Sequence, residues 1–178
     1  VFWFVLLAAF PGSLSFALNP TKTFKQYVYT VWQTGDGLPH NSIRAIVQTP
    51  DGFLWLGTGA GLVRFDGVHF TTFTRENTPN LPENSISALS VSRGGTLWIG
   101  TEASGILSFK EGKFTHYSTS EGLSHNSVAS LLASSDGSIW IGTRQGGLNH
   151  FADGRFSHFT SKDGLSGDDV ISLLESRS

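Results

Sequence analysis

Short apolar runs alternate with turn residues along most of the chain, and this pattern predicts β-strands. The clearest stretch has apolar or aromatic runs at 128–133, 138–143, 148–151 and 155–160, separated by pairs that contain glycine. Runs of this length bounded by turn pairs are typical of strands and are too short for stable helices. The stretch therefore predicts four short strands joined by tight turns.

The turn pairs themselves carry conformational information. Asp136-Gly137 and Asp153-Gly154 predict type I′ hairpin turns, in which both central residues adopt positive φ. Gly94-Gly95 stands where Asp51-Gly52 and Asp136-Gly137 stand in neighbouring stretches. Because glycine keeps the turn but has no carboxylate, we expect these aspartates to shape the backbone rather than to bind metal.

The whole pattern recurs at a fixed period. Trp55, Trp98 and Trp140 are separated by 43 and 42 residues, each within Leu/Ile-Trp-Leu/Ile-Gly-Thr. Leucines of a second motif keep the same step, at Leu38, Leu81, Leu123 and Leu165. The residues that we assign to the structure of the repeat are Trp55, Trp98, Trp140, Gly57, Gly100, Gly142, Asn41, Asn84 and Asn126. Asn and Asp in turns accept hydrogen bonds from nearby backbone N–H groups, so we expect the recurring Asn residues, and Asp168 in the fourth unit, to do this.

Four strands in about 40 to 45 residues, repeated, are the pattern of a β-propeller blade. We therefore predict an all-β propeller with three complete four-stranded blades and the start of a fourth. The expected organisation is a signal peptide at 1–17, a lead-in at 18–36, blade repeats at 37–79, 80–121 and 122–163, and the start of a further repeat at 164–178.

Aromatic residues recur with the blades and are expected to pack between them. Phenylalanine or tyrosine occurs in the third and fourth strands of every unit, at Phe65, Phe109, Phe151, Phe70, Phe114, Phe156, Phe73, Tyr117 and Phe159. Each such ring buries about 150–250 Å². We expect these rings and the tryptophans to fill the space between neighbouring sheets rather than to bind a cofactor.

Residues before the first unit match the last strand of a blade. Tyr29 aligns with Phe114 and Phe156, and Trp32 aligns with Tyr117 and Phe159. Residues 25–33 thus predict a lone outer strand, of the kind that completes a blade formed by the other terminus and so removes an exposed sheet edge. A closed ring needs about 4 to 8 blades, so further blades are expected beyond Ser178.

Composition and charge exclude several other classes. With 21 glycines and 12% aromatic residues, the chain has the composition of a turn-rich globular protein. A formal net charge of −2 provides no basic field for nucleic acid. The absence of cysteine excludes disulfides and thiolate sites, and the absence of a starting methionine indicates a fragment.

The amino terminus predicts export. Residues 1–10 are apolar or small, a run too short to span a bilayer, which needs about 20 residues. Pro11-Gly12 follows, and Ser15 and Ala17 offer small residues to signal peptidase. We expect a secretory signal at 1–17 that lacks its basic start; an uncleaved anchor or a buried strand are the alternatives.

Taken together, the motifs resemble the two-component regulator propeller repeat family. The resemblance rests on Gly-Leu-x-x-Asn-Ser-Ile/Val, the Asp-Gly turn, the Trp-Ile-Gly-Thr element and a closing Phe-x-x-Phe/Tyr, and covers about 150 of the 178 residues. The segment from Tyr29 to Phe73 is similar to the N-terminal opening of periplasmic sensor regions in that family.

This resemblance implies a sensor that lies outside the inner membrane. In the family, a transmembrane segment connects the propeller to a cytoplasmic histidine kinase, or sometimes to a diguanylate cyclase, and the ligands are often oligosaccharides. The expected partners are a small-molecule or oligosaccharide ligand and the remaining blades and membrane and kinase domains of a longer protein. A homodimer of that protein stays open, and no nucleic acid partner is expected.

Loops that vary between repeats offer the candidate ligand contacts, because propeller strands are committed to packing. One set joins successive blades and the other joins second and third strands. The candidate ligand-binding residues are His40, Glu83, His125, Glu102, Arg144 and Gln145. The six histidines show no metal-ligand spacing, so we predict no metal site and no cofactor.

Two other classes remain as alternatives. A secreted binding or scaffold protein would use the propeller to dock a partner. A propeller lyase or hydrolase is weaker, since no paired carboxylates or Ser-His-Asp set can be nominated from spacing. The stretch around Asp136-Gly137 resembles an Asp-box turn, but that box separates Asp and Gly by one residue. We expect no catalytic residue in this chain.

Overall fold

The computed structural model describes residues 30–176. The expected signal peptide, Tyr29 and most of the expected outer strand therefore lie outside the described residues. The chain divides into two compact units, Val1–Val31 and Trp32–Ser178, and the architecture below is that of the second unit.

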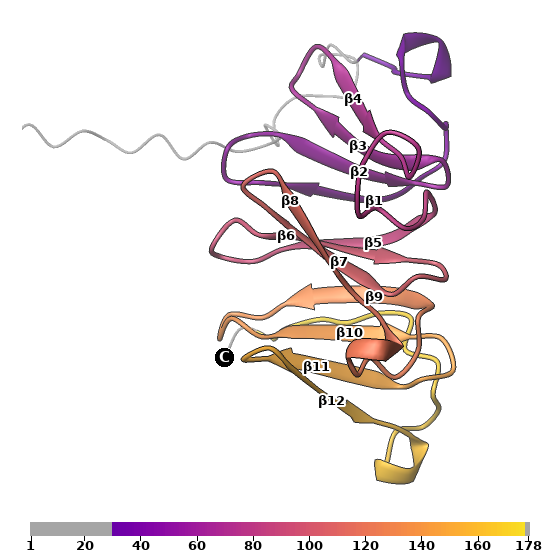
Figure 1. The fold of residues 1–178 in the computed structure, drawn as a ribbon, viewed down its shortest axis with the longest axis vertical. Helices are drawn as coiled ribbons and strands as arrows, with labels where there is room; N and C mark the ends of the chain where they lie inside the picture. Colours follow the sequence, from indigo (N-terminus) through magenta and orange to yellow (C-terminus); the bar gives the residue numbers. More distant parts are fainter. Residues whose placement is uncertain (1–29, 177–178) are drawn as a thin grey trace, which may run out of the picture. The chain divides into compact units, whose positions relative to one another are not determined.

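Three antiparallel sheets of four strands follow one another along the chain, as the repeat predicts (Figure 1). The first sheet contains β1 (Ile43–Gln48), β2 (Leu54–Thr58), β3 (Gly61–Phe65) and β4 (Phe70–Phe73). The second contains β5 (Ile86–Val91), β6 (Leu97–Thr101), β7 (Ile106–Lys110) and β8 (Lys113–Tyr117). The third contains β9 (Val128–Ala133), β10 (Ile139–Thr143), β11 (Leu148–Ala152) and β12 (Arg155–Phe159). Each sheet is a meander in which sequential strands pair, so the three complete blades are confirmed.

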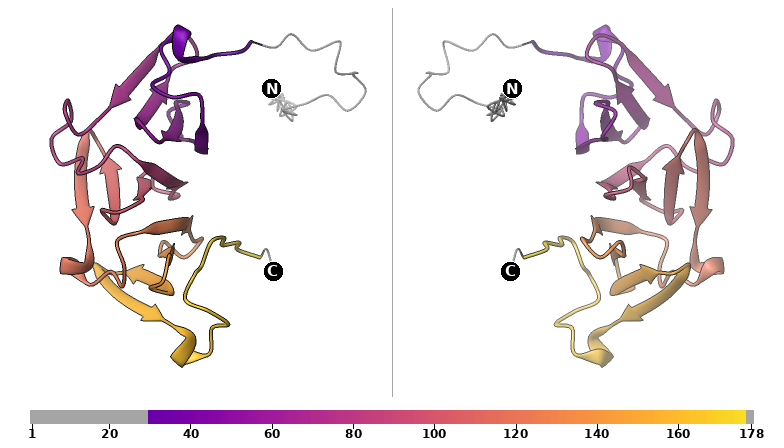
Figure 2. Two further views of the ribbon diagram at one scale, coloured as in Figure 1. Left: turned by 90° about the vertical axis from the view of Figure 1, so that its right-hand side faces the viewer. Right: turned by 90° about the vertical axis from the view of Figure 1, so that its left-hand side faces the viewer.

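The sheets pack against one another through their first strands. β5 contacts both β1 and β9, and Figure 2 shows the three sheets in chain order. The glycine after each repeated tryptophan makes this approach possible, because a Cβ on Gly57 would lie 2.8 Å from Ile86 Cγ2 and one on Gly100 would lie 2.6 Å from Val128 Cγ1. The invariant glycine of the motif is thus a packing requirement between blades.

Aromatic rings fill the outer part of the same seams, as expected. Trp55 stacks on Phe73 at 5.6 Å between ring centroids and contacts Phe109 of the next blade at 5.2 Å. Trp98 repeats this arrangement with Phe151 at 5.6 Å. Both tryptophans are buried, and two apolar clusters form around them.

One of the two predicted turn types is correct. Asp153 and Gly154 both have positive φ, at 51° and 75°, as a type I′ turn requires. At Asp136-Gly137 the prediction is wrong, because only Gly137 has positive φ, at 93°. There the Gly137 N–H donates to the Ser134 oxygen at 3.1 Å and the Ser134 N–H donates to the Ser138 oxygen at 2.9 Å, which is a type I turn with a glycine bulge. The Asp136 carboxylate accepts the Ser138 N–H at 2.9 Å and stabilises this longer loop.

The two ends of the described unit form no paired strands. Residues 30–33, the described part of the expected outer strand, are not in a sheet, and Trp32 packs on Phe65 of the first blade. Residues 164–176 form no strand either, but Ser130 Oγ donates to the Val170 oxygen at 3.1 Å, which places this segment beside β9. A strand needs a partner to complete its hydrogen bonds, and the described residues provide none for these two segments.

Candidate functional site

Both sets of variable loops lie at one edge of the sheets. Because adjacent strands are antiparallel, the start of each first strand, the end of each second strand and the start of each third strand meet there. We call this edge the loop face; it consists of residues 37–42, 80–85 and 122–127 between blades and residues 59–60, 102–104 and 144–146 within blades.

The recurring asparagines form hydrogen bonds within their own interblade connections. The Asn41 side-chain oxygen accepts the Thr34 N–H at 2.9 Å, and Asn126 accepts the Thr119 N–H at the same distance. Asn84 and Asp168 make the corresponding bonds to the Arg75 and Ser161 N–H groups at 2.7 and 2.6 Å. These side chains are therefore occupied by the scaffold.

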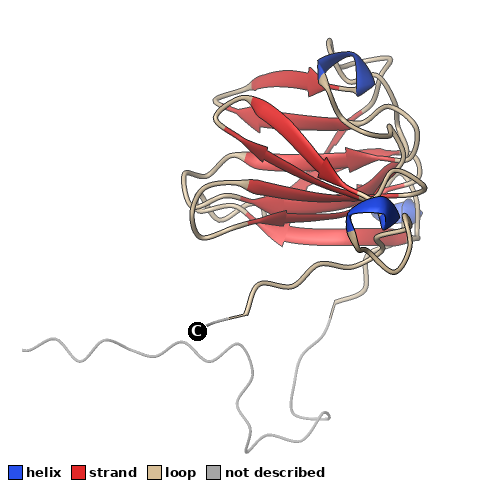
Figure 3. Cartoon of the chain, turned by 90° about the horizontal axis from the view of Figure 1, so that it is seen from below, coloured by secondary structure: helices blue, strands red, loops and turns tan. Residues whose placement is uncertain are grey.

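Most of these connections contain a short 3₁₀ helix with a capping box. The helices span Thr34–Asp36, Thr119–Glu121 and Ser161–Asp163, and Figure 3 shows them in blue at the ends of the strands. In the second, the Glu121 carboxylate accepts the Ser118 N–H at 2.7 Å, and this bond holds the Glu121 pKa below its ordinary value. In every connection a positive-φ residue stands directly before the repeated leucine, at Gly37, Asn80, Gly122 and Gly164.

Residues 74–80 depart from this rule and form no 3₁₀ helix. The interval from Phe73 to Leu81 is eight residues, whereas the interval from Tyr117 to Leu123 is six. Asn77 replaces the capping box, since its side chain accepts the Thr74 N–H at 2.8 Å and donates to the Thr72 oxygen at 3.0 Å. The sequence analysis overlooked this longer connection, although the spacing of its repeated residues contains it.

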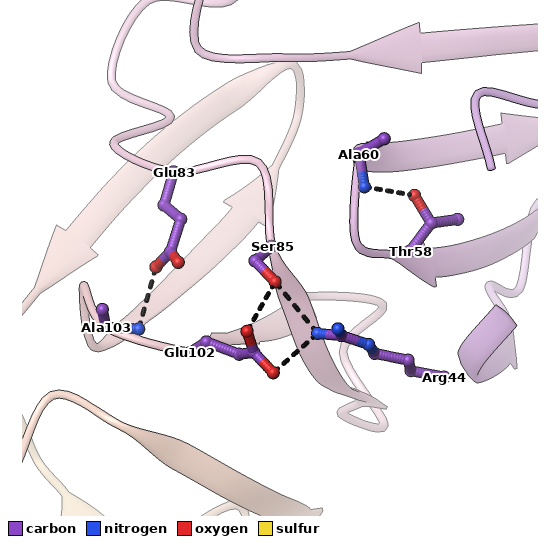
Figure 4. A network of polar contacts seen from close by, with 7 residues as sticks. All are labelled: Arg44, Thr58, Ala60, Glu83, Ser85, Glu102 and Ala103. Carbon is purple, nitrogen blue, oxygen red and sulfur yellow. Dashed lines mark hydrogen bonds and ion pairs between the residues drawn. The ribbon is translucent and has the colours of Figure 1, made fainter. Parts of the chain in front are cut away.

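A charged network crosses the seam between the first two blades on the loop face (Figure 4). Arg44, at the start of β1, places Nη1 2.8 Å from Glu102 Oε1 and donates to Ser85 Oγ at 2.9 Å. Ser85 Oγ donates in turn to Glu102 Oε2 at 2.9 Å. The Arg44 and Glu102 side chains are 36% and 51% exposed. Such exposed ion pairs contribute little stability, about 0–1 kcal/mol. The network is therefore of interest mainly as a set of polar groups that a ligand can reach.

The structure brings two of the predicted residues together at this network. Glu83 Oε2 accepts the Ala103 N–H at 2.9 Å, so Glu83 binds the loop that contains Glu102 (Figure 4). The sequence analysis missed Arg44 and Ser85. Arg44 has a detectable signal, because a charged residue stands there where Ser87 and Ala129 stand in the other repeats.

The other predicted residues lie along the loop face in separate positions. His40 and His125 each accept, at Nδ1, the N–H of the residue two positions later, Ser42 at 2.9 Å and Ser127 at 3.1 Å. The Arg144 N–H donates to the Ser127 oxygen at 2.9 Å, which places Arg144 beside the His125 connection. Gln145 has a φ of 65° and donates its N–H to Asp169 Oδ1 at 2.9 Å.

Two further features were sought within residues 30–176, a cluster of metal ligands and a helix that could span a membrane. In that range no three His, Asp or Glu residues lie close enough to hold a metal ion together. The same range contains no helix whose length and hydropathy would let it cross a bilayer.

Tandem four-stranded antiparallel sheets that pack through their first strands define a β-propeller. A family model described as "two component regulator propeller" matches residues 37–60, 80–103 and 122–145. Each match runs from the interblade connection through the first two strands to the loop after them. Three segments of the chain thus match the model of this repeat, which confirms the resemblance predicted from the sequence.

Solved structures show the same fold. The extracellular domain of the proposed hybrid two component system BT4673 from B. thetaiotaomicron aligns with 75% of this chain and 21% of its own, at 21% identity and a TM-score of 0.61. Virginiamycin B lyase from Staphylococcus aureus aligns with 74% of this chain and 45% of its own, at 17% identity and a TM-score of 0.57. The chain thus spans about a fifth of the first protein and under half of the second. A comparison with curated proteins finds no match.

Proposed function

We propose that this chain is the extracytoplasmic ligand-sensing propeller segment of a membrane-bound two-component receptor. The observation that carries the proposal is the joint presence of three two-component regulator propeller repeats and an accessible polar network that crosses a blade seam. The likeness to an extracellular domain of a two component system supports the same placement. The longer protein would be periplasmic in this part, follow a signal peptide at 1–17, and be anchored in the inner membrane.

The ligand in this proposal is a small molecule or oligosaccharide that binds on the loop face. Arg44 belongs to the first blade, whereas Ser85 and Glu102 belong to the second, so a ligand that contacts all three binds across the seam. Hydroxyl, carboxylate and guanidinium groups together suit a ligand rich in hydroxyl groups. Its binding energy would favour one arrangement of the domains that connect to the membrane.

The chain has no enzymatic role in this proposal, and catalysis belongs to a histidine kinase or diguanylate cyclase in the longer protein. The likeness to virginiamycin B lyase is one of fold, since the two chains share 17% identity. A secreted binding or scaffold protein remains the alternative; such a protein would use the same loop face without a membrane segment.

Calorimetric titration of the purified chain with a panel of neutral and acidic di- to tetrasaccharides tests this proposal. We expect saturable binding that weakens about tenfold in Arg44→Gln and in Glu102→Gln, because each variant removes one side of the network. Arg93→Gln is the matched control, since Arg93 lies in the turn between β5 and β6 at the opposite edge. Absence of binding across the panel contradicts the ligand class, and turnover of any sugar favours the lyase alternative.

A further inference from the structure

A cavity lies in the outer seam between the first two blades and meets the loop face at Asn80. It is a groove of about 690 Å³, bounded by β3 and β4 on one side, by the turn between β7 and β8 on the other, and by residues 77–80. Those last residues belong to the connection that is two residues longer than its counterpart at 117–123. Insertions in a repeat protein mark places where a surface departs from the scaffold, often for binding.

The walls of the groove combine aromatic rings with polar groups. Alternate residues of a strand share one face, so Arg64 lies on the same face of the first sheet as Leu62 and Phe73 and turns toward the second blade. Phe73 and Phe109 are half-buried and line the groove, with ring centroids 6.3 Å apart. Thr71 and Asn80 add hydrogen-bonding groups at its edge.

The charge of the groove has one sign. Arg64 and Lys113 line it, and no aspartate or glutamate does. Within residues 30–176 neither cation forms an ion pair with a carboxylate. The Arg64 guanidinium lies 4.6 Å from the centroid of the Phe53 ring, a cation–π contact that restricts its position.

This arrangement belongs to one seam rather than to the repeat. Arg64 pairs across its sheet with Trp55, and the residues that pair with Trp98 and Trp140 are Ser108 and His150. A side chain that served only the blade would be expected to recur with the tryptophan. The arginine at position 64 is therefore related to the groove of this seam rather than to the repeated blade.

We propose that the groove binds a ring compound that carries a carboxylate, at a site separate from the charged network of Arg44, Ser85 and Glu102. The carboxylate pairs with Arg64 and Lys113, since guanidinium groups bind carboxylates with directed N–H bonds. The apolar face of the ring packs on Phe73 and Phe109. An aromatic acid and a uronic acid both offer this chemistry, and the experiment distinguishes them.

The test is a titration of the full chain, followed by NMR shifts of backbone amides, with phenylacetate and with glucuronate. Phenylacetamide and methyl glucoside are the neutral partners of these probes. We expect one of the acids to saturate and to shift amides around Thr71, Asn80 and Lys113, while its neutral partner binds about tenfold more weakly. Phenylacetate binding assigns the site to aromatic acids, and glucuronate binding assigns it to acidic sugars.

Variants make the result decisive. Arg64→Gln and Lys113→Gln should each weaken the acid about tenfold. Arg155→Gln is the matched control, because Arg155 begins β12 as Lys113 begins β8. The proposal is overturned if the neutral partner binds as tightly as the acid, if Arg155→Gln weakens the acid as much as Arg64→Gln does, or if the parent chain shows no saturable binding of either acid. The parent and the variants should share one melting temperature, so that a loss of binding does not reflect a loss of folding. Glu102→Gln should leave binding in the groove unchanged. A failure of the groove proposal can therefore be distinguished from a failure of the proposed loop-face function.

Discussion

Trp32 packs edge-on against Phe65, with ring centroids 5.0 Å apart, and contacts Phe70 at 6.4 Å. The same arrangement recurs at both later seams. Phe73 lies 6.3 and 6.1 Å from the corresponding rings of the second blade, Phe109 and Phe114. Tyr117 lies 5.1 and 6.2 Å from Phe151 and Phe156. Trp32 thus covers the first blade as the fourth strand of a preceding blade would, which the alignment of Trp32 with Tyr117 predicts.

Truncation of Trp32 should therefore destabilise the first blade. We expect Trp32→Ala to lower the free energy of unfolding by about 1–3 kcal/mol, less than for a fully buried ring because Trp32 is 43% exposed. Phe159→Ala is the matched control, since Phe159 occupies the same repeat position, is 42% exposed, and contacts Trp140 of its own sheet. Urea unfolding measures both, and an equal loss in the two variants would contradict the role assigned to Trp32.

The glycine of the Trp-Ile-Gly-Thr motif is expected to be intolerant of any side chain. Gly100→Ala should cost about 1–3 kcal/mol, because the added methyl group would overlap Val128 of the next blade. Gly94→Ala adds the same methyl group in a turn where nothing lies within 4 Å, and should be neutral or stabilising by up to about 1 kcal/mol. Thermal melting of the two variants provides the comparison, and a tolerated Gly100→Ala would count against close packing of the sheets.

The fold was predictable because several independent features of the sequence repeat with one period. Tryptophan spacing, turn pairs and positive-φ positions such as Asn80 all return at one period, so a chance match of any one is corrected by the others. The turn at Asp136-Gly137 was not predictable from the pair alone. Its geometry depends on the loop around it, where Ser134 and Ser138 bond to each other and lengthen the connection by one residue.

Asn126 offers a test of the interblade connections. Asn126→Ala removes the acceptor of the Thr119 N–H and should destabilise the chain by about 1 kcal/mol. Asn126→Asp should be close to neutral, because Asp168 accepts the Ser161 N–H at the same position of the fourth repeat. Chemical unfolding of the pair separates loss of the acceptor from loss of the amide. If both variants lose the same stability, the Asn126 NH₂ group rather than its oxygen is what matters.

The capping box of Glu121 predicts a dependence of stability on pH. Hydrogen bonds from the Ser118 N–H and hydroxyl lower the pKa of Glu121 in the folded chain from its ordinary value of 4.5. A lowered folded pKa gives stability that is present above pH 4.5 and is lost as the pH falls through the folded pKa. Glu121→Gln should thus melt below the parent chain at neutral pH, with a difference that disappears in acid.

Melting temperatures of both chains across the acid range check this expectation. Glu111→Gln is a suitable control, since no hydrogen bond to the Glu111 carboxylate is present within residues 30–176. A difference between Glu121→Gln and the parent that stays constant with pH would show that the carboxylate charge plays no part.

The candidate site was less predictable than the fold. Variation between repeats identifies loops, so it found Glu83 and Glu102, which the structure places on two neighbouring loops joined by the bond from the Ala103 N–H to Glu83. It did not find Arg44, because Arg44 lies in a strand and reaches the loop face only through its long side chain. The outer groove was missed for another reason, since its walls come from strands of two blades and only the packing of those blades makes Arg64 and Lys113 line one groove.

One buried polar pair distinguishes the third blade and allows a double-mutant test. Asn149 is fully buried, accepts the Ser124 N–H at 2.9 Å and donates to Ser124 Oγ at 2.8 Å. The first two blades have Pro39 and Pro82 where the third has Ser124, and Val63 and Leu107 where it has Asn149. Proline has no N–H, so an apolar neighbour leaves nothing unsatisfied in those blades.

Asn149→Leu alone should therefore cost about 1–3 kcal/mol, because it leaves the Ser124 N–H without its acceptor. Adding Ser124→Pro removes that N–H and restores the pairing of the other blades, so the double variant should recover most of the loss. Free energies of unfolding for the parent, both single variants and the double variant give a coupling energy of about 1–2 kcal/mol. Additive losses would mean that Asn149 is retained for a reason other than the Ser124 backbone.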